Sequence, residues 1–138
     1  MSKEEIKLLN PAGLFDPSEY GFSHVAIAPA GATVVYIAGQ SGGDENGNYS
    51  SDFADQLKNS FAHLRVALAA AGARPEAVVK ITVLSVDHNE EKLRLISQAA
   101  HTMWGERKPT STLIPVPRLA SKNMLFEIDA VAVILNNE

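Results

Sequence analysis

Two carboxylates in the C-terminal third of the chain are the best candidates for chemistry. Glu127 and Asp129 lie in the run Leu125–Leu135, which is apolar at nearly all other positions, as in a buried β-strand. Side chains two residues apart share one face of a strand, so both carboxylates point the same way. A carboxylate partly removed from water can take or give a proton. The alternative is a structural role in which main-chain amides or Arg118 hold the pair.

A second candidate segment, Gly39–Gly43, matches the G-x-S-x-G pattern of serine hydrolases. In that motif the strand turns directly into a helix and exposes the serine. Here Asn46-Gly47 places another turn before the next helix. We therefore favour a glycine-rich strand end at which the main chain approaches another group closely.

The four histidines show no spacing typical of a metal pair, and we expect neither a metal nor a cofactor. His63 and His101 lie outside the apolar stripes of the helices predicted around them, so we expect both on the solvated surface. His24 follows Phe22 in a predicted strand, and His88 precedes the second helix.

The elements that position these residues can be read from hydrophobic periodicity. One helix begins after Ser51 or Asp52 and ends at Gly72, and a second begins at Asn89 and ends at Gly105. The inward face expected for the second helix consists of Leu93, Ile96, Ala100 and Met103 or Trp104. The predicted strands are Ile6–Leu9, Phe22–Ala28, Thr33–Ala38, Val78–Val86, Ser111–Pro115 and Leu125–Leu135.

This order of elements predicts an α+β fold. A turn at Pro29-Ala30-Gly31 joins the second and third strands, and we expect hairpins at both ends of the chain. Both helices should cover one face of a mixed sheet. Since the final strand is apolar on both faces, we expect a neighbouring subunit to cover the other one.

Composition bounds the function. The 138 residues suit one domain, and the apolar share of 46% with 20% charged residues is typical of a globular protein. No cysteine is present, which excludes thiol nucleophiles and disulfides. The net charge of −4 and the lack of a basic cluster argue against nucleic-acid binding. No apolar run is long enough for a membrane span or a signal peptide, so we expect a cytoplasmic protein.

Several ordered segments together resemble the RidA/YjgF family of enamine and imine deaminases. They are Tyr20-Gly21-Phe22-Ser23-His24, Ala38-Gly39-Gln40, Ala70-Ala71-Gly72-Ala73, Val78-Val79-Lys80-Ile81-Thr82-Val83 and the sequence LFEIDAVAV from Leu125 to Val133. The resemblance covers most of the chain. It implies a chorismate-mutase-like fold, a homotrimer and ligand clefts between subunits.

The resemblance also assigns roles to residues. Glu127 matches a glutamate that helps to place or activate water. Gly39 and Phe22 match the glycine and the aromatic residue of the substrate pocket, although tyrosine is common at the position of Phe22. In such a pocket we expect Gln40, Ser111 and the main chain of Gly39 to hold the substrate. The family arginine that binds the substrate carboxylate is replaced by Ser111. Arg118 matches a separate arginine common in the family and is a possible substitute. The segment before Glu127 is also one residue longer than usual, near Ala120-Ser121.

Two functions follow from this pattern. The first is a divergent RidA-like hydrolase or deaminase acting on a small imine, enamine or related C–N compound, with Glu127 orienting water. The second is a trimeric module that binds a small molecule or a partner without turnover. Ser111 at the arginine position separates this chain from members that act on 2-aminoacrylate, because an uncharged hydroxyl cannot form a bidentate pair with a carboxylate.

Overall fold

The computed structural model describes residues 5–136. Within this range, six strands, two α-helices and two short 3-10 helices follow one another. Their order is β1 (Lys7–Leu9), η1 (Ser18–Tyr20), β2 (Val25–Ile27), β3 (Thr33–Ser41), α1 (Phe53–Ala70), η2 (Pro75–Ala77), β4 (Val78–Val86), α2 (Glu90–Trp104), β5 (Thr110–Val116) and β6 (Phe126–Ile134).

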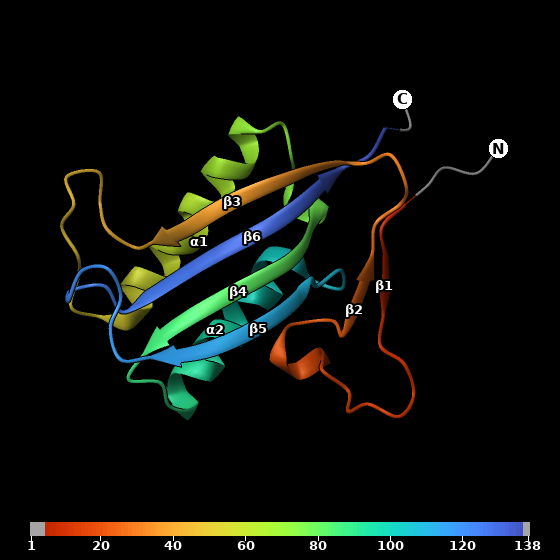
Figure 1. Ribbon diagram of the computed structural model, residues 1–138. Coiled ribbons are helices and arrows are strands. Elements are labelled where there is room, and N and C mark those ends of the chain that lie inside the picture. The colour runs from red at the N-terminus through yellow and green to blue at the C-terminus, as the bar shows by residue number, and fades with distance from the viewer. Residues whose placement is uncertain (1–4, 137–138) are drawn as a thin grey trace.

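The centre of the fold is a four-stranded sheet in the order β3-β6-β4-β5. β6 runs antiparallel to β3 and β4, whereas β4 and β5 are parallel. Both helices lie behind one face of this sheet, and the pair β1-β2 lies beside its β5 edge (Figure 1). The predicted mixed sheet with two helices on one face is therefore confirmed.

The two expected hairpins are wrong. A turn does form at Pro29–Gly31, where Ala32 N–H donates to the carbonyl of Pro29, but β2 pairs with β1 and not with β3. At the other end, β4 separates β5 from β6. Phe22 lies before β2, which is only three residues long. Sequence neighbours made hairpins the simplest choice, but β6, whose inward side chains belong to the core, lies between β3 and β4.

Both helices begin and end near the predicted residues. Asn89 caps α2, because its side chain accepts a hydrogen bond from the main-chain N–H of Lys92. Gly72 and Gly105 follow α1 and α2 with φ of 78° and 56°, a conformation that glycine adopts readily at helix ends. These caps fix the helix lengths, and hence which side chains reach the sheet.

The core lies between the sheet and the helices. Phe126, Ile128, Ala130 and Ala132 of β6 point into it and are at most 2% exposed. They meet the buried face of α1, where Leu64 and Leu68 are fully buried. This alternation puts Glu127 and Asp129 on the opposite face of β6, as predicted.

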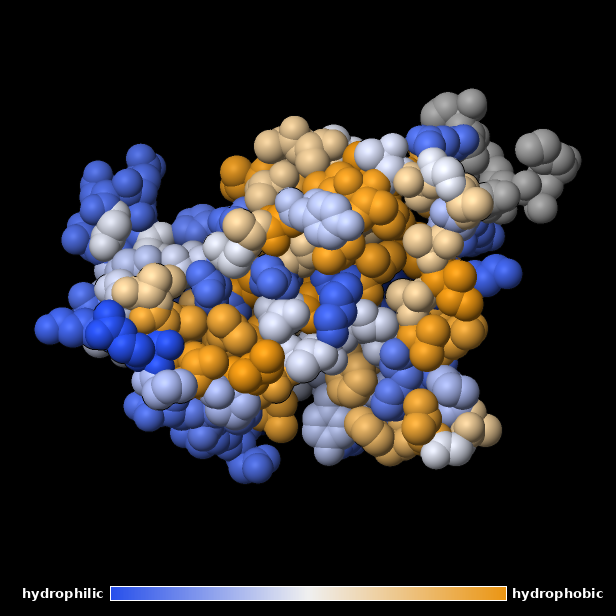
Figure 2. Space-filling view, viewed as in Figure 1, coloured by the Kyte–Doolittle hydropathy of each residue, from blue (hydrophilic) through white to orange (hydrophobic). Residues whose placement is uncertain are grey.

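We call the sheet face without helices the open face. It faces the viewer in Figures 1 and 2, and Figure 2 shows apolar areas on it, separated by polar ones. Tyr36 of β3 is 80% exposed, and Val34 and Ile114 are also exposed. Large apolar side chains grouped on one face are common at protein interfaces.

Candidate functional site

Glu127 lies on the open face, directly against the main chain of β3. An ideal Cβ on Gly39 would be 2.6 Å from Cδ and 2.8 Å from Oε2 of Glu127. Gly39 lies in a bulge, where the pairing of β3 with β6 shifts between Ile37 and Gln40. The carboxylate therefore occupies space that only glycine leaves free. The ion pairs within residues 5–136 do not include Glu127.

Asp129, two residues further along, has a different environment. Its Oδ1 accepts a hydrogen bond of 3.0 Å from the main-chain N–H of Thr82. Arg118 contacts neither carboxylate and donates instead to the carbonyls of Leu119 and Ala120, at 3.1 and 3.2 Å. A main-chain amide thus holds Asp129, which leaves Glu127 as the better candidate for proton transfer.

Phe22 and Ser111 come together at a separate place, which we call the helix-side cavity. It has a volume of about 520 Å³ and lies beside β5 and α2. Ser111 is paired with Ile81, a residue of the core beneath the helices, and paired side chains share a sheet face. Ser111 therefore faces the helices. The remaining lining residues are Phe15, Tyr20, Val83, Leu93, Ile96, Ser97 and Leu113.

The predicted site residues thus form two groups on opposite faces of the sheet. Glu127 and Gly39 touch on the open face, and Phe22 and Ser111 line the helix-side cavity. Gln40 belongs to neither group: its register partner is Ile128 of the core, and its side-chain amide donates to the carbonyl of Ala38 at 3.0 Å. A single chain does not bring the two groups into one pocket.

The Gly39–Gly43 segment shows the close approach expected of it. An ideal Cβ on Gly42 would lie 2.1 Å from the carbonyl oxygen of Gln56, at the start of α1. The Ser41 hydroxyl lies 2.9 Å from the hydroxyl of Tyr49. His63 Nδ1 lies 2.8 Å from the main-chain oxygen of Ser41, not from its hydroxyl. This arrangement does not pair Ser41 with a general base, so it does not match a serine hydrolase elbow.

The same contact corrects the expectation for His63, which is half-buried and not fully exposed on the surface. His63 lies two residues after Phe61, outside the apolar stripe of α1, but the main chain of Ser41 at the end of β3 contacts its ring. His101 is exposed, as expected, and its Nε2 lies 3.4 Å from the carbonyl oxygen of Glu19.

Of the lining residues of the helix-side cavity, only Phe22 and Ser111 were predicted as site residues, and the aromatic and polar ones that were missed are Phe15, Tyr20 and Ser97. Ser97 is only 7% exposed, and its Oγ has no hydrogen-bond partner within the described chain. A buried hydroxyl left in this state costs about 1–3 kcal/mol. Ser97 follows Leu93 by one helical turn and so lies in the apolar stripe of α2. A serine in that stripe could have been recognised in the sequence as an unusual buried polar residue. Phe15 and Tyr20 lie in a segment that gave no periodic signal.

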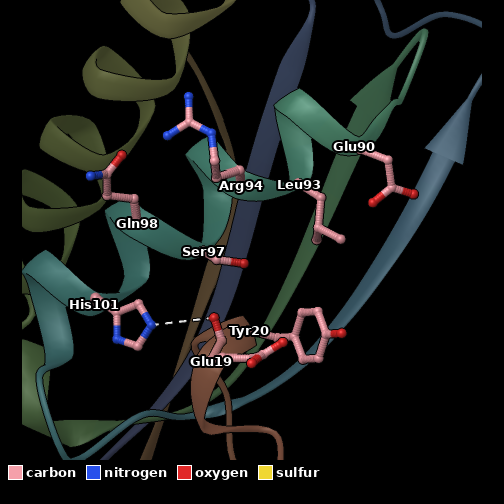
Figure 3. Close-up of a pocket in the computed structure, with 8 residues that line it drawn as sticks. All are labelled: Glu19, Tyr20, Glu90, Leu93, Arg94, Ser97, Gln98 and His101. Carbon is pink, nitrogen blue, oxygen red and sulfur yellow. Dashed lines mark hydrogen bonds between the residues drawn. The ribbon is translucent and has the colours of Figure 1, made fainter.

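Ser97, Leu93 and Tyr20 also border a second hollow of about 480 Å³ between η1 and α2, the outer cavity (Figure 3). In Figure 3 the side chains of Arg94 and Gln98 point away from Tyr20. Arg94 donates to both carboxylate oxygens of Glu91, at 3.2 and 2.7 Å. This hydrogen-bonded pair lowers the pKa of Glu91 and raises the pKa of Arg94. The guanidinium is thus already engaged on the helix surface.

The described residues, 5–136, contain neither a metal-binding cluster nor a membrane-spanning helix. No group of three or more His, Asp or Glu side chains there is placed to hold a metal ion. No helix in that range combines the length and the apolarity needed to cross a membrane.

Comparison with known proteins gives consistent matches. A family model described as Endoribonuclease L-PSP matches residues 16–134. A RutC family protein of Pyrococcus abyssi is 32% identical over 100 residues, which cover 71% of this chain and 76% of the relative.

Solved structures agree. A protein of the conserved Rid family from Yersinia pestis, YyfB, whose function is described as unknown, superposes with a TM-score of 0.87 at 30% identity. The match covers 94% of this chain and 98% of that one. Escherichia coli TdcF, solved with bound serine, matches with a TM-score of 0.65 at 25% identity, over 83% of this chain and 94% of its own.

Proposed function

The chain belongs to the RidA/YjgF family, and on that premise we propose that it is a hydrolase that deaminates a small imine, enamine or related C–N compound. The observation that carries this proposal is the Glu127 carboxylate lying against the main chain of Gly39. A half-buried carboxylate with no cationic partner among the described residues is free to take a proton.

The proposed chemistry is hydrolysis of a C=N bond. Glu127 accepts a proton from water as the oxygen attacks the imine carbon, and it passes this proton on to the nitrogen. The hydroxyl of the resulting carbinolamine then gives its proton to the amine through Glu127 as the C–N bond breaks, so that ammonia leaves, a carbonyl product remains and Glu127 is again ionised. An enamine enters the same route after protonation of its carbon gives the imine. A correctly placed general base contributes about 10²–10⁴-fold to such a reaction.

We propose further that the complete site forms between subunits of a homotrimer. Glu127 and Gly39 lie on the open face, whereas Phe22 and Ser111 line the helix-side cavity next to the edge strand β5. A second copy packed against the open face can place Phe22 and Ser111 of one protomer beside Glu127 and Gly39 of its neighbour. The exposed apolar side chains of that face support the contact.

Replacement of Glu127 tests the catalytic proposal. Glu127→Gln keeps the size of the side chain but removes the base, so we expect ammonia release from a panel of imines to fall about 10²–10⁴-fold. Asp129→Asn is the matched control, because its amide oxygen can still accept the hydrogen bond from Thr82, and it should retain most of the rate. Equal losses in both variants, or unchanged turnover in Glu127→Gln, would contradict the role of Glu127.

A second function, binding without turnover, is favoured by one observation. Ser111 stands where deaminases of this family carry an arginine, and loss of a buried charge pair costs about 2–5 kcal/mol of binding. TdcF, with its bound serine, shows that a protein of similar fold holds a small amino acid. Ligand-induced thermal stabilisation without any product from the same compounds would favour this second function.

A further inference from the structure

The helix-side cavity is largely apolar and aromatic. Phe15, Tyr20 and Phe22 line one side, and aliphatic residues of β4, α2 and β5 line the rest. Phe15 meets Tyr20 and Phe22 edge to face, with ring centroids 6.2 and 6.1 Å apart. Such rings offer both edges and faces to a further aromatic group.

The rings at this cavity are also incompletely covered by the chain itself. Phe15 is 59% exposed and Tyr20 is 42% exposed. Exposed aromatic side chains beside a cavity gain favourable burial when an apolar group enters it. A volume of about 520 Å³ falls within the range of roughly 300–1,000 Å³ found for sites of drug-sized ligands. A three-carbon enamine would leave most of it unfilled.

Besides the phenol of Tyr20, two serine hydroxyls are the polar features of this lining. Ser111 lies on β5 and Ser97 lies on α2, and the Oγ of Ser97 has no partner within the described chain. A hydroxyl can both donate and accept a hydrogen bond, which suits a carbonyl, an amide or an imine nitrogen. Ser97 is only 7% exposed. A ligand group that hydrogen-bonds to its hydroxyl would therefore supply a partner that bulk water does not.

The lining lacks positive charge. Lys and Arg are absent from the residues that border the helix-side cavity, and Arg94, at the outer cavity, is bound to Glu91. A free carboxylate entering an apolar cavity without a cation would lose its hydration and gain no ion pair. The cavity therefore selects against amino-acid-derived anions.

From these features we infer that the substrate of this site is an uncharged imine or enamine that carries an aromatic or bulky apolar group, with its polar end held by Ser97 and Ser111. This inference deepens the proposed function and rests on it for the reaction. The selectivity resides in the helix-side cavity, whereas the chemistry resides at Glu127. Binding and turnover can thus be tested separately.

Binding of three stable probes to the full chain, measured by isothermal titration calorimetry, tests the inference. We expect 3-phenylpropanamide to bind at least tenfold more tightly than 3-phenylpropanoate, which adds a charge, and than propanamide, which lacks the ring. Equal or tighter binding of the carboxylate, or failure of the aromatic amide to bind at all, would overturn the inference.

Two serines provide a matched pair of variants. Ser97→Ala should weaken binding of 3-phenylpropanamide about fivefold, because one hydrogen bond is lost. Ser60 is also buried, with an Oγ that has no partner among residues 5–136, but it lies on α1 and does not line the cavity. Ser60→Ala should leave binding unchanged, and equal losses in both variants would overturn the role of Ser97. Ser111→Arg should reverse the preference between amide and carboxylate.

Ammonia release keeps the two proposals distinguishable. Selective binding of the aromatic amide with no release from any imine would leave the cavity assignment intact and refute the hydrolase. Release that is equally fast from charged and uncharged imines would uphold the hydrolase and refute the selectivity. In Glu127→Gln, amide binding should persist while release is lost.

Discussion

At the scale of single residues, contact with Gly39 defines the position of the Glu127 carboxylate. The glycine has an ordinary φ, so it is needed for the space above its Cα and not for backbone freedom. A side chain at position 39 would push the carboxylate away from the place where water is to be activated. This makes Gly39 a positioning residue in the proposed mechanism.

We predict that Gly39→Ala displaces Glu127 and destabilises the fold by about 1–3 kcal/mol, as overpacking commonly does. Urea denaturation would measure the stability, and ammonia release the activity. In a Glu127→Ala background the added methyl group meets no carboxylate, so the same change should cost much less. Strictly additive effects in this double-mutant cycle would show that the two residues do not interact.

The positions of some site residues can be predicted from the sequence, and those of others cannot. Glu127 and Gly39 belong to strands with strong patterns, so their neighbourhood could be anticipated. Phe15 and Tyr20 lie in a segment rich in proline and glycine, where no periodicity fixes a side-chain direction. Whether Ser111 faces the helices depends on its register with β4, which only the pairing with Ile81 reveals.

At the scale of elements, Gln56 joins α1 to two loops. The side chain is fully buried, and its amide donates to the carbonyls of Ser50 and Asn123, while its oxygen accepts from the N–H of Leu125. These bonds hold the segment after β3 and the segment before β6 against the start of α1. Gln56 therefore anchors the segment that follows β3, the strand of Gly39, and the segment that precedes β6, the strand of Glu127.

We predict that Gln56→Leu lowers the free energy of unfolding by on the order of 3 kcal/mol, because three main-chain groups lose their partner. Thermal and urea denaturation would measure the loss. Lys58→Leu, at an exposed position of the same helix, is the control and should change stability by less than about 0.5 kcal/mol. A Gln56→Leu protein as stable as the control would show that water replaces these bonds.

Local patterns predicted most of these elements, but not their arrangement. Apolar spacing and end residues such as Asn89 and Gly105 define the helices, because those signals act over a few residues. The position of β6 between β3 and β4 depends on contacts between distant parts of the chain. The turn at Pro29–Gly31 looks the same whether or not its flanking strands pair, so the sequence could not exclude a hairpin there.

At the scale of the whole molecule, the open face determines what the chain must meet. The helices cover the other face, and Tyr36, Val34 and Ile114 remain exposed on this one. Burial of such side chains between copies would stabilise an assembly through the hydrophobic effect. The proposed homotrimer would also complete the site.

We predict by light scattering a particle of three times the 14.8 kDa chain mass. Tyr36→Asp should dissociate it and abolish turnover, since a carboxylate would be buried without a partner. Val66→Asp is the control, because Val66 is 68% exposed on α1, behind the sheet, and it should leave the assembly intact. A stable monomer of the unmodified protein at dilute concentration would refute the trimer.

The central position of β6 has a consequence for synthesis of the protein. β3 and β4 emerge from the ribosome long before residue 126, yet each needs β6 as its hydrogen-bonding neighbour. Until then, both strands present unpaired edges, which other nascent chains can join. A premature stop codon just upstream of β6 should therefore yield insoluble fragments, and chaperones that shield strand edges should matter most during that interval.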